Sequence, residues 1–467
     1  MRRKIIDDLI KWKNNDSRRP LVLEGARQVG KTYIVEEFGK KHYKDFIRFN
    51  LDTEEDYSFI FRRSIRPEKI IQEIEGFLQK RIDPKNTLIF FDEIQGEPRA
   101  LTALKYFNEE APEYHIIAAG SLLGVAINRG GFNFPVGKIN SLTLRPFSFQ
   151  EFLWETNPIV EEEIGKCTAK GEKLSPNMHN LAMQAFKQYL IVGGLPTAIK
   201  EFIKTKSYEA AGLEQDEIIK NYINDMSKYS SSSDAVKIQS VYKSIPGQLA
   251  KENHKFQYSK VQQGATRSRF EIAIDWLLTS GMLLKCDRLK KPLSPIFVYK
   301  DSDSFKLYMH DVGILTRQSK NRINEILHFE TIDNIFYGTV AENYVACALE
   351  EAGIYQLYWK SKYDAEIDFV IEDEILGTVP IEVKKGFKTK SKSLSVYDEL
   401  FHPEHKVRLS SKNFGEEGSL ISVPIYATEY WLKNMKEKSI NYIDEIVREE
   451  NRKMEELTKK VIQERKK

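Results

Sequence analysis

The sequence predicts an α/β protein of several domains, and three observations lead to this class. Residues 1–156 alternate short apolar runs with helical patterns, as a parallel sheet with crossover helices requires. Residues 157–233 are helical in pattern, and residues 331–430 return to strands and helices. The length of 467 residues exceeds what one core supports, because domains average about 150 residues.

Five apolar runs are the expected strands of the first sheet. They are residues 21–23, 46–51, 88–91, 116–119 and 141–144. Most of these runs are continuously apolar, which is typical of parallel strands covered on both faces. We therefore expect residues 1–156 to form a parallel α/β core with helices on both sides of the sheet.

The middle of the chain is expected to contain two helical units. Residues 157–233 form a helical extension, broken by the turn Gly193-Gly194-Leu195-Pro196 and ended by a serine run. Residues 234–330 show helices followed by expected strands at 282–284 and 297–299, an order that suits a winged helix.

The end of the chain is expected to be a second α/β domain with a helical tail. A helix around Glu342 precedes expected strands at 367–371, 379–383 and 421–426, within the domain 331–430. Residues 431–467 form a charged helix in which Val447, Met454 and Val461 are seven apart. A short self-associating coil is one interpretation, but Glu450 interrupts the apolar seam, so a solvated helix is expected.

Composition excludes several classes of protein. Hydrophobic residues make up 41% and charged residues 30%, with a net charge of +3, as in ordinary globular proteins. The three cysteines are widely spaced, which excludes a disulfide framework or a cysteine zinc site. The basic start Arg2–Lys4 is followed by Asp7 and Asp8 rather than a signal peptide's apolar run. The longest apolar stretch, 116–127, is too short to span a bilayer, so a cytoplasmic protein without a membrane partner is expected.

One motif directly indicates phosphate chemistry. Gly25-Ala26-Arg27-Gln28-Val29-Gly30-Lys31-Thr32 follows an expected strand, precedes a helical pattern and matches GxxxxGK[ST]. The two glycines let backbone N–H groups surround phosphates at a helix N-terminus. Lys31 can reach the β- and γ-phosphates, and the Thr32 hydroxyl can ligate Mg²⁺. The motif predicts ATP and Mg²⁺ as cofactors.

A second group of polar residues follows the third and fourth strands. Asp92 and Glu93 come directly after the run 88–91, at the strand end where ligands of α/β sheets bind. Asp92 is the expected second Mg²⁺ residue, and Glu93 is the expected base for the attacking water. Ser121 either contacts the γ-phosphate or water, or is a turn serine. Arg27, Arg129 and Arg145 are either charge stabilisers or surface arginines.

These motifs resemble those of a known family. The segments GARQVGKT, Asp92-Glu93-Ile94-Gln95 and 119–123 resemble AAA-type ATPases of the archaeal-ATPase kind, and 134–138 and 146–152 extend the resemblance. The turn Gly193–Pro196 is similar to a glycine–proline element of signal-transducing P-loop ATPases. Residues 267–284, 308–315 and 381–386 resemble the domain of unknown function fused to such ATPases. The resemblance implies ATP binding and hydrolysis but names no biological partner.

Basic residues in the expected winged helix make DNA a candidate partner. Three flank the expected recognition helix and four lie in the expected wing: Lys260, Arg267 and Arg269, then Lys285, Arg288, Lys290 and Lys291. Such cations can contact phosphates. Alternatively, the unit packs on the nucleotide core and its basic residues form a solvated face.

The C-terminal domain carries a nuclease-like pattern. Asp368 is followed by Glu382-Val383-Lys384, with Glu342 on the preceding helix. This pattern resembles the PD-(D/E)xK restriction-endonuclease superfamily, whose acidic pair would hold Mg²⁺ while the lysine steadies the attacking water. That superfamily also contains binding-only members, and Lys384 could merely neutralise Glu382.

Two hypotheses for the whole protein follow. In the first, ATP hydrolysis is a switch that controls a DNA-binding or nuclease-like C-terminal module. In the second, the C-terminal domain is catalytically inactive, and the chain is a nucleotide-regulated interaction protein that binds another protein or itself.

Overall fold

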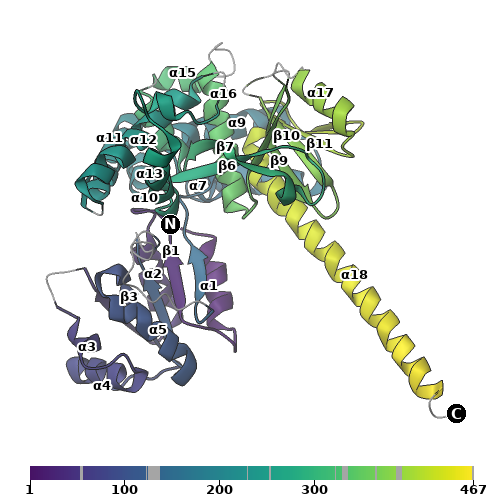
Figure 1. The fold of residues 1–467 in the computed structure, drawn as a ribbon. Helices are drawn as coiled ribbons and strands as arrows, with labels where there is room; N and C mark the ends of the chain where they lie inside the picture. The colour runs from purple at the N-terminus through teal and green to yellow at the C-terminus, as the bar shows by residue number, and fades with distance from the viewer. Residues whose placement is uncertain are drawn as a thin grey trace.

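The computed structural model describes residues 1–52, 56–121, 124, 137–228, 230–251, 254–320, 322–328, 335–362, 365–384, 386 and 392–464. Arg129 and parts of the motifs at 119–123 and 134–138 lie outside these residues. Figure 1 shows a lower body around the first sheet, an upper body of helices with a second sheet, and a long C-terminal helix that projects away.

The first sheet is parallel and has the order β2-β3-β4-β1-β5. Its strands are β1 (Leu21–Glu24), β2 (Asp45–Asn50), β3 (Thr87–Asp92), β4 (His115–Ala119) and β5 (Asn140–Thr143). Helices α1 (Ile5–Lys13), α2 (Lys31–His42), α3 (Phe59–Arg62), α4 (Pro67–Leu78) and α5 (Pro98–Glu110) accompany it. Successive residues of one strand, such as Leu21 and Val22, belong to different hydrophobic clusters, so both faces of the sheet are buried. All five expected strands are confirmed.

The strand order determines which side chains meet at the C-terminal edge. Strand β4 lies between β1 and β3, so the ends of these three strands are neighbours. Strand β2 pairs with β3 in parallel, with Asn50 opposite Asp92. The segments after β1, β3 and β4 are therefore placed around one point.

A helical region follows the first sheet, as expected. It contains α7 (Phe149–Thr156), α8 (Pro158–Lys170), α9 (Pro176–Val192), α10 (Pro196–Thr205), α11 (Tyr208–Lys228), α12 (Ser232–Leu249), η2 (Tyr258–Lys260) and α13 (Arg267–Thr279). The turn between α9 and α10 needs its glycines, because Gly193 has φ 72° and a Cβ on Gly194 would lie 2.2 Å from the Phe147 carbonyl oxygen.

The second sheet is mixed and has the order β12-β13-β11-β10-β9-β8-β6-β7. Its strands are β6 (Leu283–Leu289), β7 (Lys300–Met309), β8 (Leu357–Lys360), β9 (Glu366–Asp373), β10 (Gly377–Val383), β11 (Lys406–Ser410), β12 (Gly415–Glu417) and β13 (Leu420–Pro424). The accompanying helices are η3 (Ile296–Tyr299), α14 (Val312–Gln318), α15 (Ile323–Leu327), α16 (Ile335–Glu351), α17 (Lys392–Phe401) and η4 (Ile425–Ala427).

Two details of this sheet differ from the expectation. The strand expected at 297–299 is wrong, because these residues belong to the 3₁₀-helix η3 and β7 begins at Lys300. Strand β6, which contains residues 283 and 284 of the other expected strand, lies with β7 at one edge of the large sheet, where β6 pairs in parallel with β8. The C-terminal α/β unit therefore includes strands from before residue 331.

The last helix, α18 (Thr428–Glu464), has two different parts. Its first turns pack on α8 and α16, whereas residues 441–463 are all exposed, and Figure 1 shows this part leaving the body. Within the described part of the chain, no helix is long and apolar enough to cross a membrane.

Candidate functional site

The loop Gly25–Gly30 leads from β1 into α2, which begins at Lys31. Its backbone needs glycine at both ends: Gly30 has φ 98°, and a Cβ on Gly25 would lie 2.2 Å from the Leu144 carbonyl oxygen. Gln28 also has a positive φ, 65°. The resulting turn places backbone N–H groups at the N-terminus of a 12-residue helix, an arrangement that binds phosphate.

The side chain of Lys31 is held inside this loop. Its Nζ donates to the carbonyl oxygens of Gly25 and Ala26, both at 2.9 Å. Burial lowers the pKa of Lys31 to about 8, although the charges of Glu93 and Asp92 oppose this shift. The ammonium group thus lies beside the loop that would surround phosphates.

Thr32 and Asp92 supply the oxygen atoms expected of a magnesium site. The Thr32 hydroxyl donates to Asp92 Oδ2 at 3.0 Å, and Asp92 is only 2% exposed. Burial raises the pKa of Asp92, while Thr32 and Arg48 act in the opposite direction. A hydroxyl and a carboxylate are hard oxygen ligands of the type that Mg²⁺ prefers, so these residues fit the ion.

Arg48 was not found from the sequence. Its Nη2 and Nε lie 2.7 and 3.1 Å from Asp92 Oδ2, and its Nη1 lies 2.7 Å from Glu36 Oε1. Arg48 therefore fixes the orientation of the carboxylate. Only the pairing of β2 with β3 brings the two residues together, and no motif in the sequence indicates that pairing.

Glu93 lies directly after β3 in a left-handed backbone conformation, φ 50° and ψ 47°. Its Oε2 accepts hydrogen bonds from Gln95 Nε2 at 2.5 Å and from Ser121 Oγ at 3.2 Å. Left-handed non-glycine residues are concentrated at functional sites. The carboxylate is thus oriented by two neutral donors, and Ser121 contacts Glu93.

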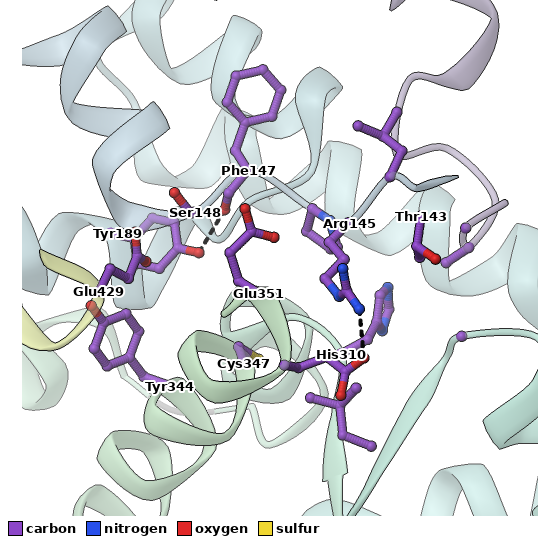
Figure 2. A pocket seen from close by; sticks show the side chains of 17 residues that line it. Thr143, Arg145, Phe147, Ser148, Tyr189, His310, Tyr344, Cys347, Glu351 and Glu429 are labelled. Atoms are coloured by element: carbon purple, nitrogen blue, oxygen red, sulfur yellow. Dashed lines mark hydrogen bonds and ion pairs between the residues drawn. The ribbon is translucent and has the colours of Figure 1, made fainter. Parts of the chain in front are cut away.

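The other two described arginine candidates have carboxylate partners. Arg27 forms an ion pair with Asp225 of α11, and Arg145 Nη2 lies 2.8 Å from Glu350 Oε1, a contact drawn in Figure 2. Both pairs join the first body to later parts of the chain.

The outer side of the loop contacts three other elements. The Tyr222 hydroxyl of α11 donates to the Arg27 carbonyl at 2.9 Å. A Cβ on Gly30 would lie 3.5 Å from Pro196, and a Cβ on Gly281 would lie 3.4 Å from the Ala26 nitrogen. A conformational change in the loop would therefore alter its contacts with α10, α11 and the turn before β6.

Several cavities border the loop, including one of about 480 Å³ lined in part by Gly25 and Ser121. Another, of about 580 Å³, is lined in part by Met1, Val29, Gly30, Tyr33 and Pro196. A third, about 80 Å³, lies between the segment 143–148 and helix α16. Figure 2 shows Tyr189, Tyr344, Glu351 and Glu429 around this third cavity.

The four residues of the nuclease-like pattern lie in the second body. Strands β9 and β10 are antiparallel neighbours, as expected, and Val383 N donates to Asp368 Oδ2 at 2.7 Å. Lys384 Nζ lies 2.9 Å from Glu382 Oε1. This ion pair is compatible with both interpretations, because the nuclease hypothesis also places Lys384 beside the acidic pair.

Glu342 lies in a buried network that the sequence did not indicate. Its carboxylate contacts Lys306 Nζ at 2.8 Å, His254 Nδ1 at 2.8 Å and the Tyr308 hydroxyl. Lys306, whose side chain is 0% exposed, also contacts Glu366 Oε1 at 2.7 Å. The only hint in the sequence is a lysine inside the otherwise apolar run 305–309.

The charges in this network shift its carboxyl groups in opposite directions. Burial opposes ionisation of Glu342, but Lys306 and His254 hold its pKa well below the ordinary value. Burial and then the charge of Glu342 raise the pKa of Asp368 to about 7, although Lys306 opposes this. Among the residues that the structure describes, no group of three or more His, Cys, Asp or Glu is placed to hold a metal ion.

Several basic residues proposed for DNA contact have acidic partners. Arg267 Nη2 lies 3.0 Å from Glu271 Oε1, and Arg267 also pairs with Asp303. Lys285 Nζ lies 2.9 Å from Asp287 Oδ1. These acids reduce the positive potential that a phosphate backbone would meet.

Comparison with known families divides the chain into three parts. Residues 17–153 match a family described as an AAA domain, AAA_14. Residues 183–324 and 337–427 match two families described as domains of unknown function, DUF8612 and DUF4143. No curated protein matches the chain.

Several solved structures are distantly similar. The Walker-type ATPase of Pyrococcus abyssi has 13% identity over 68% of this chain and 95% of its own, with a TM-score of 0.41. The ORC2 protein of Aeropyrum pernix has 10% identity over 72% of this chain and 90% of its own, with a TM-score of 0.32. A signal transduction ATPase with numerous domains from Pyrococcus horikoshii has 10% identity over 75% of this chain and 45% of its own, with a TM-score of 0.27.

Proposed function

We propose that the protein binds ATP with Mg²⁺ at the loop Gly25–Thr32 and hydrolyses it. The observation that carries the proposal is the meeting of Lys31, Thr32, Asp92, Glu93 and Ser121 at one edge of the first sheet. The AAA domain at residues 17–153 supports it.

Each of these side chains has a separate task. Lys31 binds phosphate oxygens with the backbone N–H groups of the loop. Thr32 and Asp92 would hold Mg²⁺, which supplies positive charge to the phosphates. Glu93 accepts the proton of the attacking water, while Ser121 and Gln95 fix the direction of its carboxylate.

The cavity of about 580 Å³ is the proposed seat of the nucleoside. It adjoins the helix end that would bind the phosphates, and it combines apolar walls from Val29, Ile34 and Pro196 with the aromatic ring of Tyr33. Small-molecule pockets of about 300–1,000 Å³ have this type of lining.

For the C-terminal unit, the geometry favours an interaction module that ATP regulates. The buried cation Lys306 bridges Glu342 and Glu366, and Lys384 pairs with Glu382, so lysines already balance these carboxylates. The alternative, nuclease chemistry at Asp368, Glu382 and Lys384, rests on their placement on neighbouring strands. DNA as a partner rests on the basic residues alone.

Phosphate release from ATP tests the first part of the proposal. The parent protein should hydrolyse ATP with Mg²⁺ and stop when the ion is chelated, and Lys31→Ala should abolish turnover. Lys41→Ala, an exposed lysine on the same helix, is the matched control and should behave as the parent. A parent protein that neither binds nor hydrolyses ATP would contradict the proposal.

A DNA cleavage assay tests the second part. Duplex and single-stranded DNA are incubated with Mg²⁺ or Mn²⁺, with and without ATP, and no cleavage is expected. Cleavage that disappears in both Asp368→Asn and Glu382→Gln would favour the nuclease alternative instead.

A further inference from the structure

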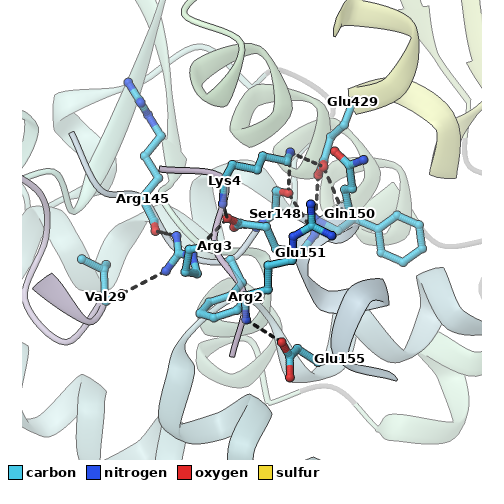
Figure 3. A network of polar contacts seen from close by, with 12 residues as sticks. Arg2, Arg3, Lys4, Val29, Arg145, Ser148, Gln150, Glu151, Glu155 and Glu429 are labelled. Atoms are coloured by element: carbon cyan, nitrogen blue, oxygen red, sulfur yellow. Dashed lines mark hydrogen bonds and ion pairs between the residues drawn. The ribbon is translucent and has the colours of Figure 1, made fainter. Parts of the chain in front are cut away.

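The basic segment Arg2–Lys4 lies between the two bodies, and Arg3 also lines the cavity proposed for the nucleoside. Figure 3 shows Arg3 and Lys4 surrounded by groups from the loop, from the segment 145–151 and from α18. Arg3 is 7% exposed. A buried guanidinium is costly unless its donors are satisfied, so its partners indicate its task.

Arg3 makes contacts in three directions. Its Nη1 donates to the Val29 carbonyl at 3.2 Å, its Nη2 to the Arg145 carbonyl at 2.6 Å, and its Nε to Glu151 Oε1 at 3.0 Å. The guanidinium carbon lies 4.0 Å from the centre of the Phe147 ring. A planar fork of donors can satisfy this geometry, and an ammonium cannot.

The contact with Val29 affects the phosphate loop directly. The Val29 carbonyl and the Gly30 N–H belong to the same planar trans peptide and point in opposite directions. Holding the carbonyl therefore fixes the direction of the N–H, which is one of the donors that the loop offers to phosphate. Gln28 and Gly30, on either side of Val29, have positive φ angles, a backbone conformation that persists only where surrounding contacts hold it. The hydrogen bond from Arg3 to the Val29 carbonyl is such a contact.

Lys4 continues the contacts toward the C-terminal helix. Its backbone N donates to Glu151 Oε1 at 2.7 Å, and its Nζ donates to Ser148 Oγ at 2.8 Å and lies 3.5 Å from Glu429 Oε2. Glu429, in the first turn of α18, accepts hydrogen bonds from Phe149 N at 2.7 Å and Gln150 N at 3.1 Å. Glu429 thus binds the N-terminus of α7, where a negative charge is stabilising.

We infer that Arg3 is a positioning residue of the ATP site and that the chain of contacts Val29–Arg3–Glu151–Lys4–Glu429 transmits nucleotide binding to α18. The inference rests on the proposed ATP binding. Glu429, in the first turn of α18, is the point at which a change in the phosphate loop would reach the C-terminal region.

Nucleotide affinity of two neighbouring arginine variants tests the first half. Arg3→Gln should bind ATP about tenfold or more weakly, because it loses charge-assisted hydrogen bonds. Arg2→Gln is the control: Arg2 is exposed and its guanidinium lies over Trp154 at 4.1 Å, so its affinity should stay within about twofold of the parent. Arg3→Lys should also bind weakly, since it keeps the charge but not the fork.

The outcomes separate this inference from the proposed function. Parental affinity in Arg3→Gln would overturn the role of Arg3 while leaving ATP binding intact. No ATP binding by the parent would instead remove the proposed function. If Arg3→Gln fails to fold, Arg3→Lys decides, with its melting temperature without nucleotide measured to exclude a purely structural effect.

Hydrogen exchange tests the second half. In the parent, ATP with Mg²⁺ should change the exchange rates of amides in residues 149–153 and 428–439. Glu429→Gln should keep parental ATP affinity and lose this change, because the charge that faces Lys4 is gone. An unaltered response in Glu429→Gln, or no response in the parent, would overturn the transmission.

Discussion

The carboxylates and lysines at the edge of the first sheet differ from those around Lys306 in where the lysine points. At the edge of the first sheet, Lys31 donates to backbone carbonyls, while Asp92 accepts from a hydroxyl and from the partly exposed Arg48. In the second sheet, Lys306 is fully buried and contacts Glu342 and Glu366 directly. The lysine of the first group therefore donates to the backbone of the phosphate loop, whereas the lysine of the second group is paired with carboxylates.

The comparison shows that residue types alone do not define such a site. In both groups the lysine is distant from the acids in the sequence, since Lys31 lies 61 residues before Asp92 and Lys306 lies 36 residues before Glu342. The difference is that Lys306 contacts its carboxylates directly. A buried, satisfied ion pair is a structural element, whereas the carboxylate oriented by neutral donors beside the phosphate loop is the one proposed to be catalytic.

The largest expected effect is on the rate of ATP hydrolysis, which should depend on the first group and not on the second sheet. Glu93→Gln should bind ATP as the parent does but hydrolyse it at least about a hundredfold more slowly, because a positioned base is lost. Glu382→Gln, an equivalent change in the second sheet, should leave the rate within about twofold. Steady-state phosphate release with a separate binding measurement gives both values; normal turnover in Glu93→Gln would remove it from the mechanism.

The next effect concerns the stability of the second group. Lys306→Met should lower the free energy of unfolding by about 3–5 kcal/mol, since it leaves buried carboxylates uncompensated. Lys360→Met removes the partly exposed lysine 3.1 Å from the same Glu366 and should cost only about 0–1 kcal/mol. Chemical denaturation measures both, and equal losses would mean that Lys306 has no special role.

The sequence predicted the first group far better than the second, for a physical reason. The phosphate loop is contiguous, and its glycines, lysine and threonine act through local backbone geometry, so the motif contains most of the site. Arg3, Arg48 and Lys306 act across strand pairings or between bodies, and neither spacing nor periodicity encodes those contacts. The pairing of β6 with β8 joins residues about seventy positions apart, which is why β6 and β7 were expected in a separate unit.

A smaller effect is the pH dependence of stability. The pKa of Asp368 rises from 3.8 to about 7 on folding, so the folded state binds its proton more tightly than the unfolded state does. Stability from this group is therefore present at low pH and is lost as the pH rises toward 7. Because Asp368 is only partly buried, we expect a loss of about 1–2 kcal/mol between pH 5.5 and 7.5.

The variant Asp368→Asn isolates this contribution. Asparagine cannot ionise but keeps an oxygen that can accept from the Val383 N–H, so the variant should lose less stability than the parent over the same pH range. Glu351 and Asp311, whose pKa values burial raises to about 7 and about 6, change in the same direction in both proteins. Identical pH profiles of parent and variant would show that burial and the charge of Glu342 do not raise the pKa of Asp368.

The smallest effect is expected from the projecting part of α18. Deleting residues 443–464 should change the free energy of unfolding by no more than about 0.5 kcal/mol, because the side chains of residues 443–463 are exposed and substitutions at such positions are nearly neutral. The deletion also tests the seam Val447, Met454 and Val461, whose side chains are 50%, 65% and 48% exposed. If a second copy of the chain covers that seam, the parent should show concentration-dependent melting and a dimer by light scattering, and the deletion should abolish both. If melting is the same at all concentrations in both proteins, the projecting part of the helix is solvated.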